Sequence, residues 1–338
     1  MSTAVNRRAA AAVVALAALI GAPVAAQSVA DLAKREGKLQ IYTLTTIELQ
    51  QTLVDGFRRK HPEIAVDFFR GDGGQIAQRF ETENAAGRNA ADVVQTVDFR
   101  FFQWRGKGLI QPYKSPALAG YPAAIHGPDG DWSTFALAVV TYAYNTKLVK
   151  VADLPRTWAD LADPKWQGKV GLQDPMQRGG SRGWVMQVWS ELGEDCGRTY
   201  MTGIAGLKPR YGQYLQVREM LLAGEIALQI AAQPNFTEPL KAKGAPVDWG
   251  VLDPAYVSGI SVGIAARAPH PNAAKSWVDY LLGAEAQALL AAHNEIPALP
   301  AARTDAYARL NAVKLVPFDL ARDESQFTEM IRSVFGPR

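Results

Sequence analysis

The chain has 338 residues, with 36 basic and 33 acidic side chains, one cysteine and four histidines. This near balance of charge, without a long basic run, argues against a nucleic acid partner. A lone Cys196 excludes an internal disulfide, and the scattered histidines show no metal-ligand spacing. We therefore expect neither a bound metal nor a cofactor.

The N-terminus has the layout of a cleavable export signal. The arginines at 7–8 precede an apolar run at 9–20, and small residues follow as far as Ala26. The run is shorter than the about 20 residues that span a bilayer. We expect a signal peptide, residues 1–26, that is cut before Gln27. A buried N-terminal helix is the alternative, and the two arginines leave the Sec and twin-arginine routes both open.

The mature chain of about 310 residues is long enough for two domains with substantial cores. Its formal charge falls from +3 to near +1 when the two leader arginines are removed. No second stretch reaches membrane-spanning length, so we expect a protein without a membrane span after processing.

Strand-like runs alternate with helical patterns in the first third of the mature chain. Ser28 can cap a first helix, which Gly37 ends. The segments that follow are predicted as a strand at 39–44, a helix at 47–60, a strand at 64–69, a glycine-rich loop at 71–74, a helix at 75–86 and a strand at 92–96. This alternation predicts an α/β fold with a largely parallel sheet.

Longer apolar runs and more turn residues mark the rest of the chain. The segments predicted there are a long strand at 135–144, a strand at 170–172, helices at 181–192 and 215–223, strands at 226–231 and 257–265, and helices at 272–282 and 284–292. Beyond residue 300 the pattern favours helical or irregular structure.

Four loops are expected to join the carboxyl end of a strand to the start of a helix, at 43–48, 71–75, 96–99 and 174–182. Ligands of open α/β sheets bind at this edge, where helix N-termini present unpaired N–H groups to anions. In the first three loops the candidate ligand-binding residues are Thr45, Thr46, Gly74, Gln75 and Asp98. A plain turn explains the glycines equally well.

The loop at 174–182 carries the strongest indication of an anion. Arg178 and Arg182 flank Gly180 and Ser181 at the start of an apolar helix, and arginine gives bidentate hydrogen bonds to carboxylates and phosphates. All four are candidate ligand residues. The alternatives are solvated surface charges for the arginines and a simple helix cap for Ser181.

Most aromatic residues near these loops are expected in the core, and the segment 99–104 is expected to pack as a helix. Two tyrosines, Tyr214 and Tyr256, are nevertheless candidates for the cleft. Tyr214 follows a Gly-Gln turn directly before a helix.

Seven short motifs follow one another in an order typical of one family. They are ADVV at 91–94, KGLIQPY at 107–113, YNTKLV at 144–149, LPRTW at 154–158, LADPKWQGKVG at 161–171, AGEIA at 223–227 and APHPNAAK at 268–275. Together they resemble the periplasmic ferric-iron-type solute-binding proteins of ABC importers. The resemblance covers residues 37–297, which is nearly all of the mature chain.

The resemblance implies a two-lobed α/β fold of the type II periplasmic-binding-protein class, with helices flanking the sheets and a ligand cleft between the lobes. The crossover strands would be 135–144 and 257–265. The implied organisation is a first lobe from 27–134 and 258–300, a second lobe from 135–257 and a helical tail at 301–338. It also implies a periplasmic protein that closes on a small-molecule solute and delivers it to an inner-membrane permease. We expect a monomer, because one ligand between two lobes needs only one chain.

One departure from the family pattern concerns the cargo. Ferric-binding members carry adjacent tyrosines where this chain has Pro234 and Asn235. Proline cannot ligate a metal, and Gln233 with Asn235 suits an organic ligand instead. We expect a small organic anion, such as a phosphonate, a sugar phosphate or a carboxylate.

Three alternatives stay open at this point. One is ferric iron held by non-standard ligands. Another is an exported hydrolase, although no Gly-x-Ser-x-Gly elbow occurs in the sequence. The third is a chemoreceptor-coupled binding module, which would have the same lobes and a different partner.

Overall fold

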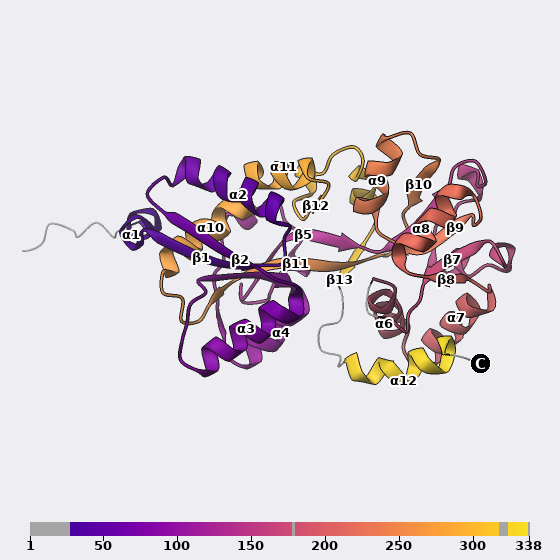
Figure 1. The fold of residues 1–338 in the computed structure, drawn as a ribbon, viewed down its shortest axis with the longest axis horizontal. Coiled ribbons are helices and arrows are strands. Elements are labelled where there is room, and N and C mark those ends of the chain that lie inside the picture. Colours follow the sequence, from indigo (N-terminus) through magenta and orange to yellow (C-terminus); the bar gives the residue numbers. More distant parts are fainter. Residues whose placement is uncertain (1–27, 178–179, 318–323, 337–338) are drawn as a thin grey trace, which may run out of the picture.

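The computed structural model describes residues 28–177, 180–317 and 324–336, so the predicted signal peptide lies outside the described part. Figure 1 shows two bodies side by side along the long axis of the molecule, each built on a sheet with helices around it. We call them the first and second lobes. The α/β class predicted from the sequence is confirmed.

The first lobe is built on an eight-stranded mixed sheet with the order β12-β5-β11-β3-β1-β2, to which β4 and β13 add by pairing with β11. Its strands are β1 (Lys38–Thr43), β2 (Ala65–Arg70), β3 (Val93–Val97), β4 (Ile110–Gln111), β5 (Ser133–Val139), β11 (Ala255–Ala265), β12 (Ile296–Pro297) and β13 (Leu315–Pro317). The strands β2, β1 and β3 run parallel, and β11 lies antiparallel to β3 and β5.

The helices of the first lobe are α1 (Val29–Glu36), α2 (Ile47–Lys60), α3 (Gly73–Ala85), α4 (Asp98–Gly106), α10 (Pro271–Leu282) and α11 (Ala284–Ala292). Their apolar faces decide how they pack. In α2, Leu53 and Phe57 are completely buried, and Phe57 meets Trp277 of α10 edge-to-face with ring centroids 5.2 Å apart. The apolar residues that recur at helical spacing along α2 therefore pack into the core of this lobe.

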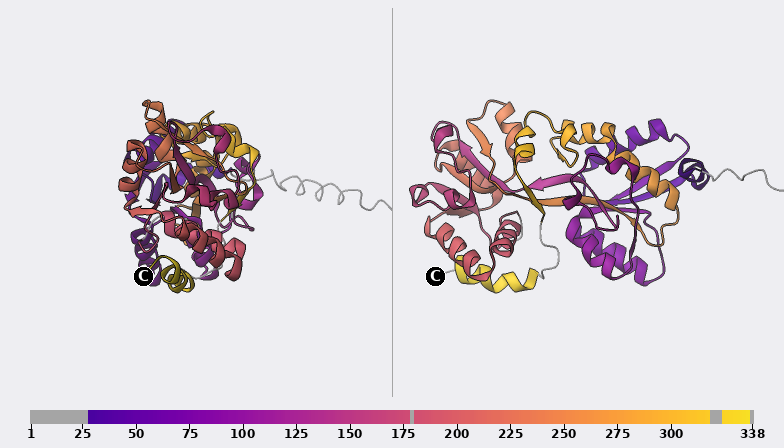
Figure 2. Two further views of the ribbon diagram at one scale, coloured as in Figure 1. Left: turned by 90° about the vertical axis from the view of Figure 1, so that its right-hand side faces the viewer. Right: turned by 180° about the vertical axis from the view of Figure 1, so that it is seen from behind.

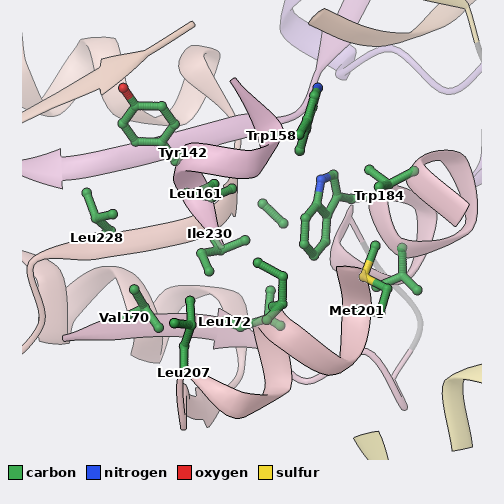
Figure 3. Close-up of a cluster of buried hydrophobic side chains, with 14 of the residues drawn as sticks. Tyr142, Trp158, Leu161, Val170, Leu172, Trp184, Met201, Leu207, Leu228 and Ile230 are labelled. Atoms are coloured by element: carbon green, nitrogen blue, oxygen red, sulfur yellow. The ribbon is translucent and has the colours of Figure 1, made fainter. Parts of the chain in front are cut away.

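The second lobe is built on a five-stranded sheet with the order β10-β6-β9-β7-β8. Its strands are β6 (Thr141–Asn145), β7 (Val170–Gln173), β8 (Arg210–Gly212), β9 (Leu228–Ala232) and β10 (Val247–Gly250). Its helices are α5 (Trp158–Leu161), α6 (Gly180–Leu192), α7 (Glu194–Gly206), α8 (Tyr214–Ala223) and α9 (Pro234–Ala242). Figure 3 shows the core beneath this sheet, where Leu172 and Ile230 of the strands lie near Trp184 of α6.

The chain passes between the two sheets at Val140, which separates β5 from β6, and again between β10 and β11 at 251–254. The long strand predicted at 135–144 is therefore two strands in different sheets. The second predicted crossover, 257–265, lies within β11 of the first sheet. We propose lobe boundaries at these two crossings, where β5 and β11 extend toward the second lobe (Figures 1 and 2).

The C-terminal segment belongs to both lobes rather than forming a separate tail. Strand β13 pairs with β11 in the first sheet, whereas α12 (Glu324–Phe335) packs on α6 and α7 of the second lobe (Figure 1). The buried side chains of Phe327 and Ile331 join the core of the second lobe. The predicted helical tail is thus an integral layer of the protein.

The carboxyl ends of the parallel strands in each sheet point toward the other lobe. Val97, the last residue of β3, pairs with Ile260 of β11, whereas Val93, the first residue of β3, pairs with Ile264, which is farther from the crossing. In the second sheet Ala232, the last residue of β9, pairs with Thr141 directly after the crossing at Val140. The loops predicted to bind ligand therefore lie at the facing edges of the lobes.

The structure differs from the prediction at the start of α3. Gly73 and Gly74 form the first turn of α3 instead of a loop, because Asp72 caps the helix and Gln75 bonds back to the Asp72 backbone.

Among the described residues, no helix is both long enough and apolar enough to cross a membrane.

Candidate functional site

A cavity of about 310 Å³ opens at the carboxyl ends of β7 and β9 in the second lobe. Three helices of this lobe, α6, α8 and α9, begin at or directly after residues of its lining. The residues that line it are Gln173, Gly180, Tyr214, Leu215, Arg218, Gln233 and Phe236. Among the described residues, this lining contains one cationic side chain and no acidic one. Its charge therefore favours an anion.

Helical spacing places two of the lining residues on one face of α8. Tyr214 and Arg218 are four residues apart and both reach the cavity, while Val217 and Leu221 are buried in the core. The ring of Tyr214 meets Phe236 of α9 edge-to-face at 5.6 Å. Burial raises the pKa of Tyr214, although a hydrogen bond from the Gln233 N–H acts against this. The phenol therefore stays protonated at neutral pH.

Two glutamines form the polar part of the lining. The hydroxyl of Ser181 is completely buried and donates to Gln173 Oε1 at 3.1 Å, so Ser181 positions Gln173 instead of facing the cavity. Gln233 lies over the start of α6, where a Cβ on Gly180 would come within 2.9 Å of Gln233 Nε2. Glycine at this position lets the amide approach the helix N-terminus.

The arginines differ in their surroundings. Arg218 donates from Nη2 to Glu219 Oε1 at 2.9 Å, and its own side chain is less exposed than that of Glu219. The Arg182 guanidinium instead donates from Nη2 to Thr328 Oγ1 of α12 at 2.8 Å. Arg178 lies outside the described residues, so its predicted role stays a prediction.

On the first lobe, the predicted residues stand at three helix starts. Thr46 accepts a hydrogen bond from Leu49 N and so caps α2, while the buried Thr45 Oγ1 has no hydrogen-bond partner among the described residues. The N–H groups of Gly74 and Gln75 donate to Asp72 Oδ1 at 2.8 and 2.9 Å. These N–H groups serve the capping box of α3 and are not free for an anion.

Asp98 lies where β3 ends beside β11, and only 6% of the residue is exposed. Its carboxylate accepts hydrogen bonds from Phe99 N at 2.9 Å and from Gly259 N at 2.6 Å. Burial raises the pKa of Asp98 to about 6, although these two backbone bonds act in the opposite direction. Asp98 thus ties the start of α4 to β11, the strand of the first sheet that begins at the crossing.

The prediction for Tyr256 needs a correction. Its ring is 4% exposed and stacks on Trp158 at 4.8 Å, within the core of the second lobe. An apolar strand position that stacks on a tryptophan favours burial over ligand contact. Asn235 is half-buried in the first turn of α9 and does not line the cavity.

In the described ranges, no group of three or more His, Cys, Asp or Glu side chains is placed to hold a metal ion.

Residues 89–324 match the family of bacterial extracellular solute-binding proteins. This match spans more than half of the chain. The chain belongs to this family. The resemblance drawn from the seven motifs is thereby confirmed, and the protein is a solute-binding component of an ABC importer that delivers its solute to a permease. The predicted periplasmic location is that of the family.

Curated relatives of this family member come from several bacteria. Iron uptake protein A1 of Synechocystis sp. is 26% identical over 288 residues, which cover 80% of this chain and 78% of the relative. A putative 2-aminoethylphosphonate-binding periplasmic protein of Salmonella typhimurium is 24% identical over 247 residues, 70% of each chain.

Solved structures confirm the two-lobed fold of this family member. The Bordetella ferric binding protein superposes with a TM-score of 0.76 at 22% identity and covers 88% of this chain and 98% of its own. A periplasmic binding protein of Actinobacillus pleuropneumoniae, solved with bound fructose-6-phosphate, has a TM-score of 0.67 at 20% identity and covers 89% and 99%.

Sequence reasoning missed four residues of the cavity, Gln173, Leu215, Arg218 and Phe236, as ligand candidates. Gln173 could have been found as the last residue of a strand whose following loop was already a candidate. Arg218 could have been found from its spacing of four residues to Tyr214. Leu215 and Phe236 carried no such signal, because apolar residues in a helix are ordinarily expected to be buried.

Proposed function

We propose that this protein binds a small organic anion in the cleft, with the anionic group at the cavity of the second lobe. The cavity lining carries this proposal, because Arg218 is the one charged side chain among its described residues and two amides stand beside it. The starts of α6, α8 and α9 add the partial positive charge of helix N-termini. We further propose that the cargo leaves chemically unchanged, since the family consists of binding proteins.

The relatives support an organic anion as one of the solutes that this fold accommodates. Their names include a 2-aminoethylphosphonate-binding protein and a protein solved with fructose-6-phosphate, beside proteins of iron uptake. At the positions where the sequence resemblance places the paired tyrosines of ferric members, this chain has Pro234, which is buried, and Asn235. Neither side chain offers the anionic oxygen that ferric iron prefers.

The first test is a thermal-shift and calorimetric screen of the mature protein with small carboxylates, phosphonates and sugar phosphates. A solute at 100 times its dissociation constant adds about 2.7 kcal/mol to the free energy of unfolding, which such a screen detects. Recovery of the bound solute unchanged after incubation, measured by NMR, tests the absence of turnover.

Arg218→Gln is the variant that tests the site. We expect it to weaken binding by about 10- to 100-fold, because a hydrogen bond to a charged group contributes about 1.5–3 kcal/mol. The matched control is Arg198→Gln on α7, where the arginine pairs with Glu194 on the protein surface. Saturable binding of ferric ion with a visible charge-transfer band, and no response to any organic anion, would contradict the proposal.

A further inference from the structure

The cavity beside α8 and α9 exposes apolar side chains that the fold itself does not need. Leu215 is 58% exposed and Phe236 is 48% exposed. The two side chains and the ring of Tyr214 form apolar walls of the cavity. Exposed apolar groups gathered in a hollow are typical of a ligand-binding groove.

The same edge of the second sheet carries further exposed apolar groups. Met176 follows the end of β7, and Tyr211 belongs to β8, the neighbouring parallel strand. Both are among the large hydrophobic residues that stay exposed in this protein. Neither residue is part of the cavity lining, so the apolar walls of the cavity are those of Tyr214, Leu215 and Phe236.

In the described part of the lining, the polar groups are few and suit a single anionic group. Arg218 supplies the charge, while Gln173 and Gln233 supply amide groups. The side-chain amide oxygen of Gln173 already accepts a hydrogen bond from Ser181. A sugar with several hydroxyl groups would bring more donors and acceptors against these walls than the amides can satisfy, and buried polar groups without partners weaken binding.

From these observations we infer that the solute is a hydrophobic monocarboxylate, with the carboxylate at Arg218 and an aromatic or branched aliphatic body between Leu215 and Phe236. This inference rests on the proposed function, which it narrows from organic anions in general. The pair formed by Tyr214 and Phe236 leaves Phe236 half-exposed, so an incoming ring can stack on it or meet it edge-to-face.

The test is isothermal titration of the mature protein with phenylacetate, benzoate and 4-methylpentanoate. Glucose 6-phosphate, 2-aminoethylphosphonate, inorganic phosphate and ferric citrate are the comparison solutes. We expect at least one of the three carboxylates to bind at least tenfold more tightly than every comparison solute.

Two variants test whether the apolar part of the solute binds between Leu215 and Phe236. Phe236→Ala and Leu215→Ala should each weaken binding of the preferred carboxylate by at least fivefold, and both side chains are exposed enough that the fold tolerates their loss. The matched control, Leu148→Ala, removes a leucine that is 54% exposed beyond the end of β6 and is not part of the cavity lining. It should change the affinity by less than twofold.

Several outcomes would overturn the inference. They are tighter binding of a comparison solute, failure of all three carboxylates to bind, and unchanged carboxylate affinity in both cavity variants. A sugar phosphate or phosphonate that binds, and loses affinity in Arg218→Gln, would overturn the hydrophobic body while leaving the proposed anion site intact. Binding of ferric ion alone would overturn both.

Discussion

At the scale of single residues, Asp98 shows how burial changes the chemistry of a carboxylate. Its oxygens accept two backbone N–H bonds, and in the described part of the chain no basic side chain forms an ion pair with it. The free energy of charging is therefore higher in the folded protein than in water. One of the two bonds reaches Gly259, so the charge of Asp98 acts on the strand that begins at the crossing between lobes.

We predict that Asp98 makes the protein less stable as the pH rises from 4 to 7. Burial raises the pKa of Asp98 to about 6, whereas an aspartate in an unfolded chain has a pKa of about 3.9. Between these values the native state binds more protons, so the free energy of unfolding falls with rising pH. Between pH 4 and pH 7 this amounts to about 2 kcal/mol for a shift of this size.

Asp98→Asn is the variant that isolates this effect, because asparagine has nearly the shape of the protonated acid. Urea unfolding at pH 4 and pH 7 should show that the variant gains about 2 kcal/mol relative to the wild type over this interval. An equal pH dependence of both proteins would show that Asp98 ionises freely in the folded state.

At the scale of elements, caps decide where several helices end. Gly224 ends α8 in the left-handed region, with φ of +78°, and its N–H bonds back to the carbonyls of Met220 and Leu221. Gly203 in contrast lies within α7, where a Cβ would meet no atom within 4 Å. The same residue type therefore has opposite effects on stability at the two positions.

We predict that Gly224→Ala lowers the free energy of unfolding by about 1 kcal/mol, because a side chain disfavours the left-handed conformation. Gly203→Ala should raise it by about 0.5–1 kcal/mol, since alanine is the better helix former. Chemical denaturation of both variants beside the wild type measures the difference. The same sign for both would contradict this account of the helix ends.

At the scale of the whole molecule, the C-terminal segment ties the lobes into one structure. Strand β13 adds to the first sheet, and α12 covers α6 and α7 of the second lobe. Arg182, at the start of α6, donates to Thr328 of α12. The helix that borders the cavity is thus braced by the last helix of the chain.

We predict that Ile331→Ala lowers the free energy of unfolding of the second lobe by about 2–5 kcal/mol. Ile331 is completely buried against the core of that lobe, and its loss leaves a cavity. Urea unfolding followed by tryptophan fluorescence measures this, since Trp184 and Trp189 lie in the same core. The exposed Val151→Ala serves as control and should change stability by less than about 0.5 kcal/mol. A similar small effect at Ile331 would show that α12 is only loosely attached.

The sequence by itself determined the class of fold and most of the elements that carry it. Helix α2 was predicted with its observed ends, residues 47–60, because its apolar spacing and its terminal residues are local signals. Helices α7 and α9 were missed. The first contains several glycines and the second contains Pro239, so their local propensity opposes the helix that tertiary packing stabilises.

Only the tertiary structure decided which of the candidate residues meet. It brings Gln173, Tyr214 and Gln233 to one cavity from three separate segments, and it places Tyr256 in the core. It also brings Arg182 within hydrogen-bonding distance of Thr328 of α12, more than 140 residues later in the chain. Local periodicity tells whether a residue is on a helix or a strand, whereas contacts of this range depend on how whole elements pack. That is why the sequence could indicate the edge at which we propose that a solute binds and not the side chains that surround it.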